Sequence, residues 1–423
     1  MTPLKALGGT SDILPEEARA WQQLEEKARR VFHLYGYQEI RTPLIEEAAV
    51  FTSSLGEAAE IVTKQMYLFE DRGGRSVALR PEGTASVVRA FIEHGLDKTA
   101  SVSRFYYGGP MFRAERPQRG RRRQFHQIGV EVFGPAGPYQ DVEVLCLLRR
   151  LLEEWGLKGW VLKLNSLGCR EDRPKMVEHV RQKLTPHAAK LCEDCRVRLE
   201  KNPLRILDCK EEGCRRLSEG IDVFEAACAA CKEHFGRVTE GLKALQLPFE
   251  RDPHLVRGLD YYTRTAFEVV HSDLGAQDAL GGGGRYDDLV RLMGGTAVPA
   301  IGFAVGLERV LLALGEGKVL PPARASKAFV ATVTPAQIPA GLELAEFLRS
   351  SGIASAANME DRPLKRQMEQ FSKLDPSGIV LILGEEELAQ GVYTVKNLAT
   401  GEQKKVSRSD VVKEIQQSGG GSR

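Results

Sequence analysis

Two β-prone runs joined by a short basic connection constrain the fold of this chain more than any other feature of its sequence. The runs cover residues 104–112 and 124–133, and five arginines lie between them, from Arg116 to Arg123. A segment so basic, and so interrupted by Gly and Pro, can neither be buried nor continue a strand. The pattern therefore predicts two antiparallel strands that project a cationic loop.

Side-chain alternation then predicts which residues of this hairpin share a face. Arg113 and Glu115 lie on one face after the first run. The second run places a ring, an amide and a carboxylate together, at Phe125, Gln127 and Glu131. An arginine fork donates well to phosphate, so the combined face fits an anionic ligand, although a basic loop alone is also consistent with a solvated charge run.

The 423 residues, of which 42% are hydrophobic and 27% charged, are enough for two or three domains. We expect an α+β first domain over residues 1–322, in which an antiparallel sheet is flanked by helices and a helical, cysteine-rich insertion occupies about 170–250. Beyond a Pro-rich linker, alternating helices and strands predict a small α/β domain with a largely parallel sheet over 326–417. Residues 418–423 are expected to form a frayed tail.

Local patterns predict the individual elements of these domains. Helices are expected over 16–35, 144–155, 286–293, 306–314, 338–350, 364–373 and 409–416. Strands are expected over 76–79, 160–164, 261–270, 328–334 and 379–383, beside the hairpin. Taken alone, the glycine run 281–284 predicts a turn and lacks the ending of a nucleotide P-loop.

Charge and apolar patterning exclude some function classes. The chain begins without a basic region followed by an apolar run, and its later apolar stretches are interrupted by arginines, so neither export nor membrane insertion is expected. Six of the eight cysteines lie between Cys192 and Cys231 without a secretory signal, which is typical of a reducing compartment, the cytoplasm by default. The net charge of +2 means that nucleic-acid contacts must come from local basic patches.

Several stretches resemble class II aminoacyl-tRNA synthetases, and two are specific to the histidyl-tRNA synthetase family. Residues 42–46, with Pro43, resemble motif 1, residues 111–120 resemble motif 2, and residues 302–309 resemble motif 3. Residues 124–131 look like the strand that follows motif 2 in the histidyl family, and residues 255–262 and 279–286 are the two stretches specific to that family. The resemblance covers nearly the whole chain from residue 9, and the order and spacing of the motifs carry it.

The resemblance implies an ATP site. In this family the motif 2 arginine holds the α-phosphate, which assigns Arg113, and the motif 3 arginine holds the γ-phosphate, which assigns Arg309. Phe125 would stack on adenine, and Glu115 would accept from adenine or orient the loop. Arg113, Arg257 and one or more Mg²⁺ ions would stabilise the transition state of adenylate formation.

The resemblance also implies how histidine is recognised. The α-amino group would be held by Glu82, with Gly83 and Thr84 beside it, and Gln127 would contact the substrate carboxylate. Glu131 and Tyr262 would bind the two ring nitrogens, with Tyr261 adjacent to them. Such a site rejects apolar analogues, because they leave buried polar groups unpaired.

Further implications concern partners. The motif 2 loop of this family meets the acceptor end of histidine tRNA, so its candidates here are Arg116, Gln118 and Arg119. Residues 326–417 would bind the anticodon, and motif 1 would form a homodimer. The main alternative is the non-enzymatic, histidine-sensing regulatory paralogue of ATP phosphoribosyltransferase, which generally lacks the anticodon domain. Another class II synthetase and a purely structural RNA-binding module are more distant alternatives.

The cysteines are not explained by the resemblance. Cys192 with Cys195, and Cys228 with Cys231, form two Cys-x-x-Cys pairs, and four such thiolates can hold a tetrahedral, structural Zn²⁺. Cys209 and Cys214 offer an alternative second pair. Equally, these residues are reduced thiols that pack in the core of the insertion.

Overall fold

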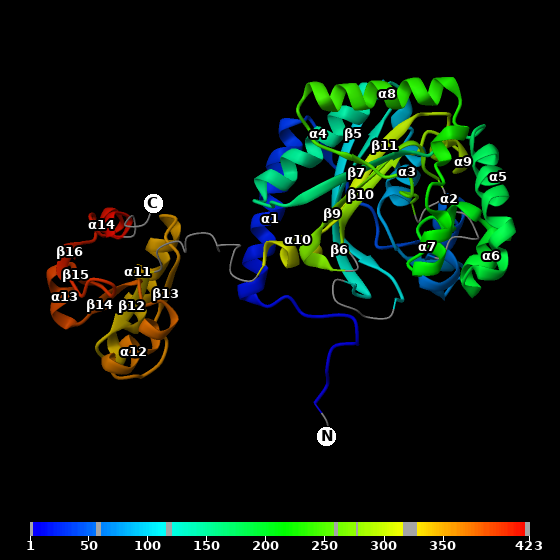
Figure 1. The fold of residues 1–423 in the computed structure, drawn as a ribbon. Coiled ribbons are helices and arrows are strands. Elements are labelled where there is room, and N and C mark those ends of the chain that lie inside the picture. Colours follow the sequence, from blue (N-terminus) through cyan, green and yellow to red (C-terminus); the bar gives the residue numbers. More distant parts are fainter. Residues whose placement is uncertain are drawn as a thin grey trace. The chain divides into compact units, whose positions relative to one another are not determined.

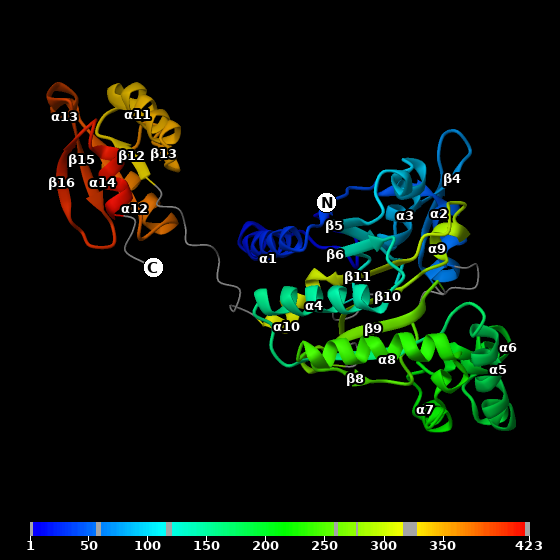
Figure 2. The same cartoon turned by 90° about the horizontal axis from the view of Figure 1, so that it is seen from above.

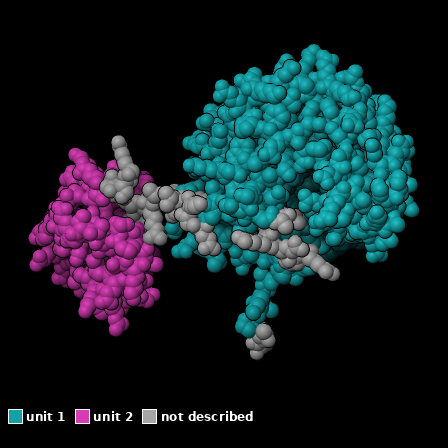
Figure 3. All heavy atoms as spheres, in the orientation of Figure 1, with its two compact units in different colours: residues 1–320 teal, residues 321–423 magenta. Residues whose placement is uncertain are grey.

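The computed structural model describes residues 3–55, 61–115, 121–257, 261–275, 278–315 and 328–418. The chain divides into two compact units, residues 1–320 and 321–423, coloured separately in Figure 3. The domain boundary expected between 322 and 326 and the tail from 419 onward lie outside the described residues. Within the described part of the chain, no helix has the length and apolar character needed to cross a membrane.

Unit 1 is built on an eight-stranded sheet, in the order β1-β5-β6-β11-β10-β9-β7-β8. All neighbouring strands are antiparallel except the edge pairs β1 with β5 and β7 with β8. The predicted hairpin is confirmed, with Met111 opposite Phe125. The strands are β1 (Gln38–Glu39), β5 (Ser103–Phe112), β6 (Gln124–Phe133), β7 (Trp160–Ser166), β8 (Glu250–Arg251), β9 (Thr263–His271), β10 (Ala279–Arg285) and β11 (Ala300–Gly306).

Long amphipathic helices cover this sheet and form the main core with it. The helices are α1 (Pro15–Leu34), α4 (Pro138–Glu154), α8 (Ala229–Ala244) and α10 (Leu307–Leu314). Helix α1 begins with Pro in its first turn, where no backbone N–H is needed, and buries Trp21, Leu24 and Ala28 along one stripe. Helices α4 and α8 lie side by side across the sheet (Figures 1 and 2).

A smaller, three-stranded sheet and its helices form a second core of unit 1. The elements are β2 (Ile45–Glu47), β3 (Tyr67–Glu70), β4 (Ser76–Leu79), α2 (Ala48–Leu55), α3 (Thr84–Glu93) and α9 (Leu289–Leu292). Their core joins Phe51 and Phe91 to Tyr107, Tyr261 and Tyr286. Helix α9 is much shorter than the helix predicted over 286–293. Residues 286–288 still belong to the connection that follows β10, and Gly294, with its positive φ, ends the helix at the other side.

The expected helical insertion leaves the sheet after β7 and returns through α8. It contains α5 (Arg173–Leu184), α6 (Glu193–Lys201) and α7 (Glu212–Ser218), which gather at one end of α8 (Figures 1 and 2). Its own core consists largely of Leu, Ile, Val and Cys side chains. The insertion is thus a separately packed body attached to the large sheet.

Unit 2 is a five-stranded sheet, in the order β13-β12-β14-β15-β16, with helices. Its elements are β12 (Ala328–Thr332), α11 (Ile338–Ser350), β13 (Ser355–Ala357), α12 (Leu364–Leu374), β14 (Ile379–Leu383), α13 (Glu385–Gln390), β15 (Val392–Asn397), β16 (Gln403–Ser407) and α14 (Val411–Ser418). The α/β prediction is confirmed, but the prediction of a largely parallel sheet is wrong for one half, because β14, β15 and β16 pair antiparallel. Strand β16 is mostly exposed, so it lacks the apolar alternation that would have predicted it.

Candidate active site

A cavity of about 240 Å³ lies over the central strands of the large sheet. Ten of the residues assigned from the sequence line it, although they come from segments scattered over most of unit 1. They are Glu82, Thr84, Arg113, Glu115, Phe125, Gln127, Arg257, Tyr261, Tyr262 and Arg309. The structure therefore brings the predicted phosphate side and the predicted amino-acid side into one site.

The phosphate side is formed by the continuation of the β5–β6 hairpin. The backbone N–H of Arg113 donates to the carbonyl of Arg123 at 2.9 Å, which extends the ladder by one pair. The Arg113 Nε donates to the Pro81 carbonyl at 3.0 Å, and its guanidinium lies 5.1 Å from the centre of the Phe125 ring. Burial lowers the pKa of Arg113, yet an arginine remains charged at any physiological pH. The cation is thus oriented before any ligand arrives.

The opposite wall is formed where β11 meets α10. The Arg309 guanidinium donates to the Ala279 carbonyl, and burial lowers its pKa. Next to it, the Glu308 carboxylate accepts from the backbone N–H of His126 at 3.0 Å and lies 3.1 Å from its Nδ1. This link between β6 and α10 was not predicted from the sequence, which had no feature that pairs residues so far apart.

Glu82 is positioned by the start of α3. Its carboxylate accepts from the backbone N–H groups of Thr84 and Ala85 at 2.7 and 2.8 Å, and burial raises its pKa. Gly83 lies directly against Tyr107, because an added Cβ would lie 2.3 Å from the ring. A side chain at position 83 would therefore displace the loop that carries Glu82.

Glu131 is 1% exposed and is not among the residues that line the cavity. Its carboxylate accepts from the hydroxyls of Thr84 at 2.7 Å, Tyr107 at 3.3 Å and Tyr286. Burial raises its pKa to about 8, while the hydrogen bonds from Tyr286 and Thr84 act in the opposite direction. Gly302 faces it from β11, where an added Cβ would lie 1.8 Å from a carboxylate oxygen. The two tyrosine partners were missed by the sequence prediction.

Arg257 closes the amino-acid side. Its Nη1 donates to Glu268 at 2.8 Å, and its guanidinium lies 5.5 Å from the centre of the Tyr262 ring. Burial opposes the charge, but Tyr262 and Glu268 raise the pKa of Arg257 above its usual value. Gly282 leaves room for this guanidinium, because an added Cβ would lie 2.7 Å from Nη1. The run 281–284 is therefore part of the central strand β10 and not the predicted turn.

Several buried polar atoms of the site have no hydrogen-bond partner within the described ranges. They include the Gln127 Oε1 and the Tyr261 hydroxyl. Buried polar groups are almost always satisfied, so unpaired ones at a cavity wall indicate a polar ligand. The amino-acid side thus offers both acceptors and donors to a small polar molecule.

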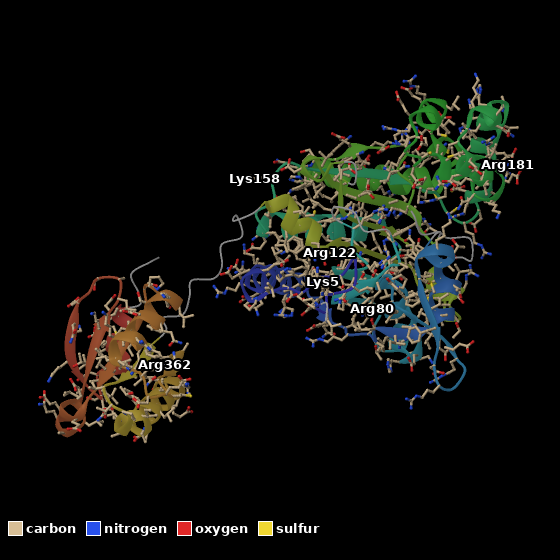
Figure 4. The ribbon with its side chains drawn as sticks, turned by 90° about the horizontal axis from the view of Figure 1, so that it is seen from below. Lys5, Arg80, Arg122, Lys158, Arg181 and Arg362 are labelled. Carbon is tan, nitrogen blue, oxygen red and sulfur yellow. The ribbon has the colours of Figure 1, made fainter. Side chains whose placement is uncertain are left out.

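The residues assigned to tRNA, Arg116, Gln118 and Arg119, lie outside the described residues. The end of the same loop does reach the cavity, because Arg121 lines it and forms an ion pair with Glu115 at 3.2 Å. Arg122, labelled in Figure 4, donates to Ser11 of the N-terminal segment. The sequence prediction did not assign Arg121 to the cavity.

Arg80, also labelled in Figure 4, connects the segment before Glu82 to β5 and to the motif 1 segment. It is 4% exposed, and it donates to the carbonyls of Pro110 at 3.0 Å and Thr42 at 3.1 Å. It thus joins three segments by hydrogen bonds to backbone, which is a positioning role that the sequence prediction did not assign.

The four cysteines assigned to one zinc site do not come together. Cys192 and Cys195 lie with the alternative pair, Cys209 and Cys214. The remaining pair, Cys228 and Cys231, lies with Cys169 and Asp172 instead. The prediction that both Cys-x-x-Cys pairs share one zinc site is therefore wrong. The spacing shows that the two cysteines of a pair lie close together, but it does not show which two pairs meet in the fold.

An antiparallel sheet with one arginine on a motif 2 hairpin, a second at a strand–helix junction and a buried amino-acid pocket between them defines a class II aminoacyl-tRNA synthetase. The sequence profile of the family described as Histidyl-tRNA synthetase matches residues 9–310, and that of the Anticodon binding domain matches residues 327–418. The chain belongs to the histidyl-tRNA synthetase family.

Individual relatives agree over nearly the full length. The histidine–tRNA ligase of Halothermothrix orenii is 45% identical over 415 residues, which are 98% of this chain and 99% of the relative. That of Moorella thermoacetica is 48% identical over 406 residues, 96% of each chain. The crystal structure of apo S. aureus histidyl-tRNA synthetase is similar with a TM-score of 0.82 at 34% identity, covering 98% of this chain and 100% of that one.

Proposed function

We propose that this chain is a histidine–tRNA ligase. It activates L-histidine with ATP to histidyl-adenylate and pyrophosphate, and it then transfers histidine to the 3′ end of tRNA(His). The observation that carries the proposal is one cavity in which Arg113 and Arg309 face a buried set of carboxylate, amide and phenol groups. Phosphate binding and amino-acid binding are thus adjacent, as adenylate formation requires.

In the ATP half of the site, Arg113 binds the α-phosphate and Arg309 the γ-phosphate. Phe125 stacks on adenine, and Glu115 accepts from adenine or orients the loop through its ion pair with Arg121. Mg²⁺ would be held largely by the substrate phosphates, and Glu115 and Glu308 are the carboxylates of the cavity wall that would complete its ligands. The ion supplies charge neutralisation of the phosphates.

In the histidine half, Glu82 holds the α-amino group and Gln127 contacts the carboxylate. Glu131 and Tyr262 bind the two ring nitrogens, and Tyr261 completes the wall. The hydrogen bonds from Thr84, Tyr107 and Tyr286 hold the Glu131 carboxylate rigidly, which makes recognition of a ring with two polar nitrogens stringent.

The activation step needs alignment more than acid–base chemistry. The substrate carboxylate is ionised near neutral pH and attacks the α-phosphorus in line with the departing pyrophosphate. Arg113 and Arg257 stabilise the negative charge that develops at the α-phosphate. The fixed contacts of Arg257 with Glu268 and Tyr262 mean that it requires no reorganisation during the step.

The proposal includes the tRNA partner and the assembly that the resemblance to this family implies. The loop containing Arg116, Gln118 and Arg119 contacts the acceptor end, unit 2 binds the anticodon, and two copies form a homodimer in the cytoplasm. Exposed apolar side chains at and beside β2 and β3 support the dimer, since such patches mark contact surfaces. They are Leu44, Ile45, Leu68 and Phe69.

ATP–pyrophosphate exchange tests the proposal directly. We expect exchange that depends on added histidine and on no other proteinogenic amino acid. Equal exchange with proline or threonine would refute the specificity, and no exchange at all would favour the regulatory paralogue. Substituting Gln118 or Arg119 by Ala should weaken aminoacylation while sparing the exchange, because the loop contacts tRNA and not histidine.

A further inference from the structure

The insertion contains two compact groups of metal-ligating side chains that the proposed reaction does not use. The four-cysteine cluster consists of Cys192, Cys195, Cys209 and Cys214. The cysteine–aspartate cluster consists of Cys169, Asp172, Cys228 and Cys231. Within each cluster, one ligand atom from every residue lies within 4.8 Å of all the others.

Distances in the four-cysteine cluster fit a shared metal ion. Tetrahedral zinc with Zn–S bonds of about 2.3 Å separates its sulfurs by about 3.8 Å. The Sγ atoms of Cys192 and Cys209 lie 3.9 Å apart, which is nearly twice the length of a disulfide bond, about 2.05 Å. The Cys214 Sγ also accepts from the backbone N–H of Cys192 at 3.3 Å, as sulfurs in such sites commonly do. None of the four cysteines forms a disulfide within the part of the chain that the structure describes.

Both clusters place thiols at the start of a helix. Cys192 is the N-terminal cap of α6, and Cys228 is the N-terminal cap of α8, with Cys195 and Cys231 in the following first turns. The two Cys-x-x-Cys pairs therefore have the same local structure, but each belongs to a different cluster.

The cysteine–aspartate cluster contains a buried carboxylate, Asp172, of which one oxygen has no hydrogen-bond partner within the described residues. Asp172 is 0% exposed, and its Oδ1 has no hydrogen-bond partner within the described ranges, while Oδ2 accepts from the Cys169 N–H at 3.3 Å. Gly168, with a φ of +66°, turns the chain tightly enough that an added Cβ would lie 2.7 Å from the Asp172 Cβ. A buried carboxylate is normally paired with a cation or a metal ion. A metal ion held by Asp172 and the three cysteines would supply that positive charge.

Packing of inert thiols explains these observations less well. Cys195, Cys209, Cys214 and Cys231 do belong to the apolar core of the insertion. That explanation leaves the carboxylate of Asp172 among three cysteines without a counter-charge. It also does not explain why Cys192 and Cys228, which are only partly buried, direct their sulfurs into the two clusters.

We propose that the insertion binds two structural zinc ions, one in each cluster. Three thiolates and a carboxylate, or four thiolates, fill a tetrahedral shell and leave no position for substrate. Zinc suits both sets, because soft sulfur dominates and a single carboxylate is tolerated. The ions stabilise a small body that is built of short helices.

The position of the second ion links the insertion to the active site. Cys169 follows the end of β7, and Cys228 precedes α8, so this ion joins the start of the insertion to the start of its return helix. Next to Cys169, Leu167 donates to the Arg264 carbonyl at 2.7 Å, and the Arg264 N–H donates to Gly168 at 2.6 Å. Arg264 has a φ of +48° and follows the tyrosine pair of the site. The ion therefore holds the segment that carries those tyrosines.

The core of the insertion contacts the catalytic arginine through its neighbour. Val256, which precedes Arg257, is 9% exposed and packs in the same apolar cluster as Cys195, Cys209, Cys214 and Cys231. The side chain of Arg257 lines the active-site cavity. Loss of either ion should thus loosen the support of Arg257 without removing any group that touches substrate.

Metal analysis of the full chain, purified without chelator, tests the proposal. We expect about two zinc ions per chain, bound by sulfur at about 2.3 Å with a minor oxygen contribution at about 2.1 Å in X-ray absorption at the zinc edge. Cys209→Ser and Asp172→Asn should each lose one ion, and Cys146→Ser in α4, outside both clusters, should lose none. The absorption measurement needs no variant, so it stands even if a variant fails to fold.

Opposite results are equally clear. Protein without stoichiometric zinc, with iron in its place, or with disulfides among these cysteines overturns the proposal. A single zinc that survives either substitution overturns the assignment of two sites. Asp172→Asn should also lower the kcat of histidine-dependent exchange, by up to about 100-fold for a displacement near 1 Å. Only this last measurement rests on the proposed function, because zinc content is determined whether or not the protein is active.

Discussion

The cavity and the insertion both bury polar side chains, but they stabilise them in different ways. Around the cavity, buried groups are held by hydrogen bonds and ion pairs between residues far apart in the sequence, such as Thr84 with Glu131 and Arg257 with Glu268. In the insertion, the buried polar groups are mainly thiols gathered in two clusters. The comparison shows that a large sheet can orient charges by its own packing, whereas a small helical body needs another source of order.

The two regions meet at a buried network centred on Asp141 of α4. Its carboxylate accepts from Arg285 at 2.7 Å, from Thr265 at 2.5 Å, and lies 2.8 Å from the Nε2 of His234 in α8. Asp141 and Arg285 are both 0% exposed. The return helix of the insertion is therefore joined to the sheet by charge-assisted contacts as well as by apolar packing.

The largest expected effect comes from breaking this network. Asp141→Asn leaves the Arg285 guanidinium buried without its main counter-charge, and it should lower the free energy of unfolding by about 3–5 kcal/mol. Urea denaturation monitored by circular dichroism measures the change, with Asp97→Asn, at an exposed hydrogen bond with Thr296, as the matched control. A loss below about 1 kcal/mol, the range of a surface pair, would show that apolar packing alone joins the two regions.

A second prediction concerns charge that acts on the reaction and not on the fold. Arg257→Ala should lower single-turnover adenylate formation by about 10²–10³-fold, about 3–4 kcal/mol, while the unfolding transition stays near that of the wild type. Arg251→Ala, which removes an exposed ion pair with Asp222 in the insertion, should leave the rate unchanged. Near-normal adenylate formation by the Arg257 variant would assign the residue a structural role instead.

The third prediction uses the raised pKa of Glu131. Between the usual carboxyl pKa of 4.5 and the folded value of about 8, the folded state keeps a proton that the unfolded state has lost. The free energy of unfolding should therefore fall as pH rises through this window, by up to about 1.4 kcal/mol per pH unit from this group.

Glu131→Gln isolates that contribution. The difference in unfolding free energy between wild type and variant, measured in urea at several pH values from 5 to 8, should change in favour of the variant as pH rises. Glu343→Gln, an exposed carboxylate of unit 2, should show no such trend. A difference that stays constant with pH would mean that Glu131 ionises normally in the folded state.

The smallest expected effect comes from the surface of the insertion. Arg216 and Glu212 form an ion pair one turn apart on α7, with side chains 74% and 77% exposed. Arg216→Ala should change the stability by no more than about 0.5 kcal/mol, because solvent screens such pairs. A clearly larger loss in thermal unfolding would show that surface charge stabilises the insertion and would weaken the contrast with the cavity.

The sequence alone determined the local geometry of the site. Strand alternation placed Arg113 with Glu115 and Phe125 with Gln127, and the structure shows all four lining one cavity. Period-two and period-3.6 patterns concern neighbours in the chain, so they can be recognised without knowing its path. The glycine run 281–284 shows the limit, since its central strand position depends on the strands packed on both sides.

Only the tertiary structure decided which distant groups meet. The Cys-x-x-Cys pairs were visible in the sequence, but the chain path joined Cys192 to Cys209, and Cys228 to Asp172. The same holds for Glu131, whose partner Tyr286 lies 155 positions further along the chain. Local spacing fixes which side chains leave the same helix turn or strand face, whereas contacts between separate segments depend on how the whole core packs, and no short pattern encodes that packing.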